Sequence, residues 1–250
     1  MQPQYFEKSY LVHYYETAVH QTLRITNLMN YFEEVALLQS HDKQVGLDYY
    51  QKHHVIWMLH KWSINLNRSP VFGQQILIRT LPVSVAGFMG FRKFWVLDEN
   101  GQTLVEADSA WLFVNTSTKR PIRISDDMKH AYGHYNQPES KLEMPEVPGF
   151  AQPHFSKEFN VRYADIDINE HVNNVRYVDW ALEAIPVEIL RSHRLSNIRI
   201  IFRKETVYGQ KVNSQVQVLF AADSVKCIHR IVDEQGRDVC GLYTAWVPIS

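Results

Sequence analysis

The segment RYADIDINEHVNNVRYVDW, residues 162–180, holds the residues whose types and spacing best suit catalysis. Polar and ionisable side chains fall there on alternate positions: Asp165, Asp167, Asn169 and His171. Alternate residues of an extended chain share one face, so the spacing predicts that these four side chains point the same way. Two carboxylates, an amide and an imidazole on one face are suited to general acid–base chemistry on a carbonyl group.

This polar stripe ends where the sequence predicts a helix. Asn173 or Asn174 is a good N-cap residue. Apolar residues then recur at helical spacing: Val175, Val178, Leu182 and Ile185. Free N–H groups and the helix dipole favour negative charge at such a terminus, so an oxyanion formed near Val172, Asn173 and Asn174 would be stabilised.

Calcium binding is a different possible use of these residues. The pattern Asp-x-Asp-x-Asn at 165–169 resembles the beginning of an EF-hand loop. That loop requires Gly at its sixth position and Glu at its twelfth, and this chain has Glu170 and Arg176 there. The sequence therefore argues against a calcium site.

Zinc binding and a purely structural role also have to be weighed. His130 and His134 have the spacing of zinc ligands on a helix, but they flank the loop sequence AYG and have no third ligand nearby. We therefore predict no metal. A polar turn with a capping asparagine and a hydrogen-bonding histidine remains possible from spacing alone.

The chain repeats itself in three places. VLDENGQTLVEADSAWLFV (96–114) resembles IVDEQGRDVCGLYTAWVPI (231–249) at an offset of 135 residues, and SPVFGQ (69–74) resembles ETVYGQ (205–210) at 136. TNLMNYFEEVA (26–36) resembles VNNVRYVDWAL (172–182) at 146. The three segments keep the same order in both copies, which predicts two copies of one unit. The changing offset predicts about ten extra residues between helix and strands in the first copy.

We expect the first unit over residues 1–133, a linker over 134–153 and the second unit over 154–250. The linker sequence HYNQPESKLEMPEVPGFAQP is polar and carries four of the ten prolines.

Each copy shows the same order of elements: an extended stretch, an amphipathic helix and then strands. The helix of the first copy is indicated by Ile25, Met29, Phe32 and Ala36. Alternating runs predict strands over 55–66, 74–83, 91–98, 103–114, 197–205, 213–222, 225–233 and 238–249. Asn100-Gly101 and Gln235-Gly236 predict hairpin turns. This is an α+β pattern given twice, with an antiparallel sheet wrapped around a central helix.

Only the second copy carries the ionisable set. The helix offset places Gln21, Leu23 and Ile25 opposite Asp167, Asn169 and His171, and the strand offset places Ser69 opposite Glu205. A polar cap needed for folding should occur in both copies. The asymmetry therefore favours a hydrolytic site in the second copy.

At these residues the sequence resembles a known family. DIDINEHVNNVRYVDW resembles the signature of the acyl-acyl carrier protein (ACP) thioesterases, which include plant plastid enzymes and bacterial relatives, and FRKET (202–206) resembles the family's second motif. The duplication fits as well, because family members are tandem hotdog domains on one chain. The resemblance extends from about Tyr5 to Ser250. It implies a cofactor-free hydrolase that converts fatty acyl-ACP to free fatty acid and ACP, which ends fatty acid chain elongation.

The resemblance also implies a catalytic set: Asp167, Asn169, His171 and Glu205. Glu205 or Asp167 would activate a water molecule with help from His171, or Asp167 would attack the thioester directly. The sequence leaves these routes open. Plant members often have Cys after the glutamate, whereas this chain has Thr206, so a cysteine nucleophile is not available at this position.

The first unit would then have a different task from the second. Its apolar side chains are candidates to line an acyl-chain tunnel or, alternatively, form ordinary core: Met29, Phe32, Trp57, Met58 and Trp62. Because ACP is acidic around its phosphopantetheine serine, basic residues are candidate contacts or, alternatively, plain solvated surface. We single out Arg176, Lys119, Arg120 and Arg123.

Bulk composition excludes several further classes of protein. Lys+Arg is 26 and Asp+Glu is 27, interspersed, so we expect no nucleic-acid binding. No apolar run approaches the ~20 residues of a membrane helix, so we expect no membrane insertion. Two cysteines and a start without a signal or transit peptide predict a bacterial cytoplasmic enzyme. The fused repeat already supplies the pairing that single hotdog domains obtain by dimerising, so we expect either a monomer or a homodimer through sheet edges. The rival functions are an acyl-coenzyme A thioesterase, a hotdog dehydratase and a non-catalytic acyl-binding hotdog protein.

Overall fold

The structure is a computed structural model that describes residues 5–134 and 137–249. The chain forms two compact units. The first comprises Met1–His60 and Asn67–Met144, and the second comprises Lys61–Leu66 and Pro145–Ser250. Residues 135 and 136 of the predicted linker lie outside the described residues, and 137–153 contain no helix or strand.

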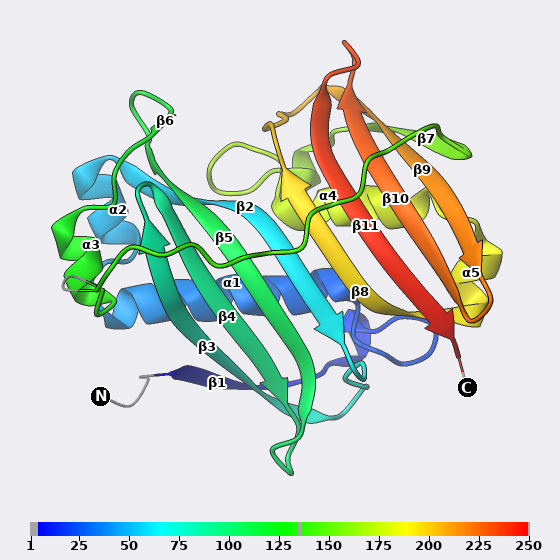
Figure 1. Cartoon of the computed structure of the whole chain (residues 1–250), viewed down its shortest axis with the longest axis horizontal. Coiled ribbons are helices and arrows are strands. Elements are labelled where there is room, and N and C mark those ends of the chain that lie inside the picture. The colour runs from blue at the N-terminus through cyan, green and yellow to red at the C-terminus, as the bar shows by residue number, and fades with distance from the viewer. Residues whose placement is uncertain (1–4, 135–136, 250) are drawn as a thin grey trace. The chain divides into compact units, whose positions relative to one another are not determined.

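The first unit is built on an antiparallel sheet with the strand order β1-β3-β4-β5-β2. Its strands are β1 (Phe6–Leu11), β2 (Val55–Leu66, to His60 in this unit), β3 (Gln75–Ala86), β4 (Met89–Leu97) and β5 (Thr103–Asn115), with the short β6 (Arg120–Pro121) pairing with β5. Helix α1 (Ile25–Asp42) lies across one face of this sheet (Figure 1). Two short helices complete the unit: α2 (Leu47–His53) and α3 (Asp126–Ala131).

Helix α1 forms the centre of the first unit's core. The predicted stripe of Ile25, Met29, Phe32 and Ala36 is confirmed, because all four residues are buried. The Phe32 ring lies 4.9 Å from the ring of Phe94 on the sheet. Apolar contacts of this kind, rather than helix propensity, hold an amphipathic helix on a sheet.

The second unit repeats the arrangement around a shorter helix. Its strand order is β8-β11-β10-β9-β7, and the Lys61–Leu66 end of β2 belongs to this unit and pairs with β8. The strands are β7 (Phe155–Asn160), β8 (His193–Phe202), β9 (Lys211–Ala221), β10 (Ser224–Asp233) and β11 (Asp238–Pro248). Helix α4 (Asn174–Glu183) lies against this sheet, and α5 (Val187–Ser192) follows it (Figure 1). Pro186 separates the two helices because proline cannot continue a helix interior.

All eight predicted strands are present, with ends at most four residues from the predicted ones. The two predicted hairpin turns are confirmed by Gly101 at φ 77° and Gly236 at φ 74°. The short helices α2, α3 and α5 were not predicted, because six or seven residues are too few to show a helical period.

The two units correspond at a helix offset of 149 residues, so the predicted offset of 146 is wrong. In the first unit the Ala18 N–H donates to the Thr22 carbonyl at 2.8 Å, with Gln21 at φ 57° between them. The Asp167 N–H donates in the same way to the His171 carbonyl at 2.8 Å, with Glu170 at φ 63°.

The error has a physical origin. A shift of three residues keeps an apolar stripe near the same face of a helix, so the apolar pattern matches almost as well one turn out of register. The offset falls from 149 at the helix to 136 at residues 205–210, so the first unit has thirteen extra residues rather than about ten. Part of this length extends α1 to 18 residues, compared with 10 in α4.

Candidate active site

The predicted extended stripe over 165–171 is not present. Residues Tyr163–Asp165 form a 3₁₀ turn, and the hydrogen bond from Asp167 to His171 closes a tight turn behind it. Glu170 adopts a left-handed conformation that reverses the chain direction. As a result the Asp165 side chain is buried whereas Asn169 is exposed, so these side chains do not share one face.

Asp165 holds this loop together. Its carboxylate accepts hydrogen bonds from the Arg162 backbone N–H at 2.9 Å and from the Arg162 guanidinium at 2.7 and 3.1 Å. Burial by itself raises the pKa of Asp165, but the Arg162 bonds outweigh burial and lower it. In the first unit Glu16 is equivalent and accepts from the His13 N–H at 2.8 Å. An acid at this position therefore serves the fold in both units.

Asp167 and Asn169 form a local pair. The Asn169 backbone N–H donates to Asp167 Oδ1 at 2.8 Å, and the Asn169 side-chain amide donates to Asp167 Oδ2 at 3.4 Å. Both carboxylate oxygens of Asp167 are thus oriented by one neighbour. This arrangement is an Asx-type turn, in which a side-chain oxygen caps the backbone two residues on.

His171 and Glu205 form the second pair, and they come from different segments. His171 ends the tight turn, and Glu205 follows β8. The His171 Nε2 lies 3.0 Å from the Glu205 Oε2. The two side chains are 28% and 40% exposed, so solvent can reach both. The Val172 N–H donates to the Thr206 carbonyl at 2.9 Å and holds the two segments side by side.

The start of α4 lies directly after this pair. The Asn173 side chain is the N-cap, with Oδ1 accepting from the Val175 N–H at 3.1 Å. The Val172 and Asn173 N–H groups both donate to protein carbonyls, those of Thr206 and Asp165, at 2.9 Å. Within the described residues the Asn174 N–H donates to no acceptor. Of the three predicted oxyanion donors, Asn174 is therefore the one available to a ligand.

The first unit carries a different set at the same positions. The structural offsets place Ala18, His20 and Thr22 opposite Asp167, Asn169 and His171. Ser69 lies opposite Glu205, because the Leu23 N–H bond to the Pro70 carbonyl at 2.8 Å repeats the Val172–Thr206 bond. The corrected register thus preserves the asymmetry: the pairing of imidazole with carboxylate occurs in the second unit and has no counterpart at these positions in the first.

The residues predicted to line an acyl-chain tunnel are buried or half-buried. Met29 and Phe32 on α1 are fully buried, and the Trp57 ring lies 4.8 Å from that of Phe113. Met58 is half-buried on β2. Trp62 lies in the segment Lys61–Leu66, which groups with the second unit rather than the first. A tunnel lined by these residues stays a prediction.

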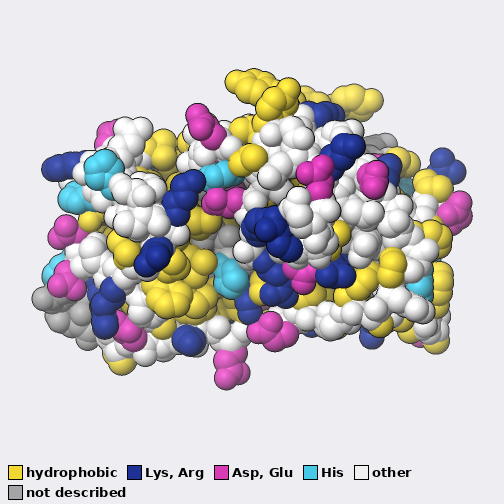
Figure 2. Space-filling view, turned by 90° about the horizontal axis from the view of Figure 1, so that it is seen from above, with side chains coloured by type: hydrophobic (Ala, Val, Ile, Leu, Met, Phe, Trp, Pro, Cys, Tyr) yellow, Lys and Arg dark blue, Asp and Glu magenta, His cyan; other side chains and the backbone are white. Residues whose placement is uncertain are grey.

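Two of the residues predicted to contact ACP lie next to acidic side chains, and the other two are exposed. The Arg176 guanidinium lies 3.0 Å from Asp179, and that of Arg123 lies 2.8 Å from Glu139. Lys119 and Arg120 are exposed at the β5–β6 turn. Basic and acidic side chains are interspersed on the face shown in Figure 2.

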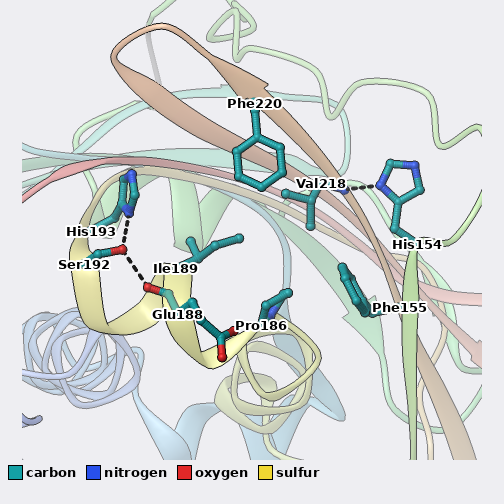
Figure 3. A pocket seen from close by; sticks show the side chains of 9 residues that line it. All are labelled: His154, Phe155, Pro186, Glu188, Ile189, Ser192, His193, Val218 and Phe220. Atoms are coloured by element: carbon teal, nitrogen blue, oxygen red, sulfur yellow. Dashed lines mark hydrogen bonds between the residues drawn. The ribbon is translucent and has the colours of Figure 1, made fainter.

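The second unit also contains a pocket that the sequence did not reveal (Figure 3). It has a volume of about 540 Å³ and involves α5 and the neighbouring ends of β7, β8 and β9. Its lining is His154, Phe155, Pro186, Glu188, Ile189, Ser192, His193, Val218 and Phe220. None of the predicted catalytic residues lines it. No sequence pattern indicated it, because its aromatic residues fit ordinary strand patterns.

A central helix covered by an antiparallel sheet, present twice on one chain, defines a tandem hotdog protein. Comparison with known families makes the assignment specific. The acyl-ACP thioesterase N-terminal domain matches residues 3–132 and the acyl-ACP thioesterase C-terminal domain matches residues 151–248. The chain therefore belongs to the acyl-ACP thioesterase family.

Among curated relatives, the chloroplastic oleoyl-acyl carrier protein thioesterase 2 of Arabidopsis thaliana is 30% identical over 229 residues, covering 84% of this chain and 62% of the relative. The chloroplastic palmitoyl-acyl carrier protein thioesterase of Gossypium hirsutum is 27% identical over 270 residues, covering 97% of this chain and 64% of the relative. The chain thus spans less than two thirds of the length of these relatives.

Solved structures agree with the fold. A candidate oleoyl thioesterase from Lactobacillus plantarum superimposes with a TM-score of 0.90 at 25% identity, covering 100% of this chain and 98% of that one. The 12:0-ACP thioesterase of Umbellularia californica superimposes with a TM-score of 0.85 at 23% identity, covering 98% of this chain and 94% of that one.

None of the helices in the described part of the chain combines the length and the apolar character needed to span a membrane.

Proposed function

We propose that the chain hydrolyses the thioester of fatty acyl-ACP to free fatty acid and ACP, and so ends fatty acid chain elongation. The observation that carries the proposal is the contact of His171 with Glu205 at 3.0 Å beside the N-terminus of α4. Family membership and the names of the curated relatives support a thioester on a carrier protein as the substrate.

In the proposed reaction, water is the nucleophile. The Glu205 carboxylate, which lies 3.0 Å from the His171 imidazole, takes a proton as the water oxygen attacks the thioester carbonyl carbon. The carbon–sulfur bond breaks, and the thiolate of the phosphopantetheine arm takes up a proton from the pair. One water and one thioester thus give one fatty acid and one thiol.

The developing oxyanion would lie at the N-terminus of α4. The Asn174 N–H is free to donate there, and the positive end of the helix dipole adds to the effect. Loss of one such donor typically slows a reaction by ~10²–10³.

Asp167 and Asn169 have supporting roles in this scheme. Their hydrogen bonds to each other shape the turn that presents His171. Of the two candidate bases, Glu205 is the one that contacts the imidazole, so we assign proton transfer to Glu205 and His171.

The remaining predictions complete the proposal. The first unit would bind the acyl chain near Met29, Phe32, Trp57 and Met58. ACP would be the partner, with Lys119 and Arg120 as its more accessible contacts. A cytoplasmic location, and a state of monomer or homodimer, remain predictions.

The test is the rate of thiol release from acyl-ACPs of C8 to C18 and from the matching acyl-coenzyme A esters. We expect faster release from the carrier-protein esters. His171→Ala should lower kcat by at least ~10³-fold and Glu205→Gln by ~10²-fold, since general acid–base groups contribute factors of this size. The matched control is His20→Ala, which removes an imidazole from the equivalent loop of the first unit.

Three results would replace the proposal. Faster release from coenzyme A esters would make the chain an acyl-coenzyme A thioesterase. Acyl binding without any thiol release would make it a binding protein, and the turn at 165–171 would then be structural. Equal activity of the wild type and His171→Ala would remove the imidazole from the mechanism.

A further inference from the structure

A buried polar contact joins helix α4 to the segment after β8. The Tyr177 hydroxyl hydrogen-bonds to Thr206 Oγ1, and the Thr206 N–H donates to the same hydroxyl at 3.1 Å. Tyr177 is 3% exposed and Thr206 is 1% exposed. A phenol has one proton to donate and lone pairs to accept, so one hydroxyl can make both bonds. We call this contact the Tyr177–Thr206 clip.

The clip connects the two segments that carry the His171–Glu205 pair. Thr206 directly follows Glu205, and its carbonyl accepts from the N–H of Val172, which directly follows His171. Tyr177 lies one turn into α4, the helix that begins just after Val172. The contacts therefore close a ring through α4, Thr206 and Val172. Displacement of either segment would strain a buried hydrogen bond.

The first unit keeps the backbone of this arrangement but not the clip. The Leu23 N–H donates to the Pro70 carbonyl at 2.8 Å, which repeats the Val172–Thr206 bond. The same offsets place Pro70 opposite Thr206 and Leu28 opposite Tyr177. Pro70 has no N–H and no hydroxyl, and Leu28 is 1% exposed. An apolar pair therefore serves the fold of the first unit.

The presence of a polar pair in the second unit and an apolar pair in the first indicates that the clip has a role beyond folding. Burying hydroxyl groups has a desolvation cost that their hydrogen bonds only offset, so an apolar pair is the simpler solution for a core. The polar pair occurs in the unit that also holds His171 and Glu205. Burial raises the pKa of Tyr177, and the nearby Glu205 charge acts in the same direction. The Tyr177 hydroxyl thus stays neutral and lies within the electrostatic reach of the carboxylate.

We propose that Tyr177 and Thr206 are positioning residues that hold the Glu205 carboxylate against His171. They act through the backbone of Glu205 and Val172 rather than on the substrate. The proposal rests on the proposed hydrolase function. Its expected size follows from geometry, because a displacement of a reacting group by ~1 Å can slow a reaction ~10²-fold.

The test uses Tyr177→Phe and Thr206→Val, which remove a hydroxyl with little change of shape, and Thr206→Ser, which keeps the hydroxyl. We expect kcat to fall ~10- to 10²-fold in the first two, with KM within about twofold and an altered pH dependence of kcat. Thr206→Ser should retain most of the activity. If Tyr177→Phe fails to fold, the contrast between Thr206→Val and Thr206→Ser decides the question.

The matched control is Thr244→Val, which removes another buried threonine hydroxyl from the same unit. Thr244 Oγ1 accepts from Trp246 Nε1 at 2.8 Å and lies 3.0 Å from His229 Nε2. Thr244→Val should lower the free energy of unfolding and leave kcat unchanged. An equal fall of kcat in Thr244→Val and Thr206→Val would overturn the proposal, since general loosening would then explain both.

A second readout does not depend on turnover. The ring nitrogen resonances of His171, measured by NMR, report its contact with Glu205. We expect Tyr177→Phe and Thr206→Val to move these resonances toward those of Glu205→Gln. Unchanged resonances together with wild-type kcat would overturn the clip. A wild type that releases no thiol would overturn the proposed function alone, because the resonances still test the clip.

Discussion

At the residue scale, the two candidate carboxylates differ in what holds them. The Asp167 oxygens both accept hydrogen bonds from Asn169, at 2.8 and 3.4 Å, whereas a Glu205 oxygen lies 3.0 Å from the His171 imidazole. Hydrogen bonds to a carboxylate stabilise its negative charge and so weaken it as a nucleophile. Direct attack by Asp167 is therefore the less favoured route.

This assignment predicts the result of a trapping experiment. If water attacks the thioester, no covalent intermediate forms on Asp167. A single turnover quenched with hydroxylamine should leave the peptide that contains Asp167 unmodified, as measured by mass spectrometry. A hydroxamate on Asp167 would instead reveal an anhydride and assign the nucleophile to this residue. The same peptide from His171→Ala, treated identically, gives the background.

At the element scale, the sequence predicted the strands and the helices α1 and α4 well, but it missed the short helices α2, α3 and α5 and the turn at 165–171. Strands have a period of two that is visible over ten residues, so β2 was predicted at its observed bounds, Val55–Leu66. The loop depends on a left-handed conformation at Glu170, and the equivalent loop of the first unit depends on one at Gln21; neither residue is glycine, so neither carries a compositional signal. The sequence therefore suggested an extended stripe where the chain turns back.

The individual site residues were predictable only in part. His171 and Glu205 are 34 residues apart; the motif resemblance placed both in the catalytic set, but only the structure brings them into contact. The Val172 and Asn173 N–H groups are occupied because they donate hydrogen bonds to the carbonyls of Thr206 and Asp165. No sequence pattern fixes such tertiary partners.

The N-cap of α4 allows a test of how much local capping contributes to the stability of the fold. Asn173→Ala removes the side-chain acceptor of the Val175 N–H and should lower the free energy of unfolding by about 1 kcal/mol. Asn174→Ala, one position later, removes no capping bond and is the matched control. Urea denaturation measures both. Equal effects of the two substitutions would show that Asn173 does not act as the cap.

At the scale of the whole molecule, the duplication separates tasks between two copies of one architecture. The Trp111 Nε1 bond to Ser109 at 2.7 Å and the Trp246 Nε1 bond to Thr244 at 2.8 Å occupy equivalent positions, at the predicted offset of 135. The shared framework thus extends to side-chain hydrogen bonds. Where one unit has a polar residue and the other has an apolar residue at the equivalent position, the shared fold does not require the polar one.

His229 on β10 is such a difference, because the same offset places Phe94 opposite it. His229 is 1% exposed, and its Nε2 lies 3.0 Å from Thr244 Oγ1. Burial lowers the pKa of His229 to about 3, since the interior disfavours the charged imidazolium. In the unfolded chain the pKa returns to the ordinary value near ~6.5.

This difference in pKa makes stability depend on pH. Between about pH 6.5 and 3 the unfolded chain binds a proton at His229 that the folded chain does not, so the free energy of unfolding falls as the pH is lowered. The slope from this one residue approaches ~1.4 kcal/mol per pH unit and disappears above pH ~6.5. His229→Phe introduces the residue that the first unit has at the equivalent position. It should reduce the slope of the free energy of unfolding against pH by that amount, because the other histidines are still present and contribute as before. Urea denaturation of both proteins from pH 7.5 to 4.5 measures it, and parallel curves would show that His229 is protonated in the folded state.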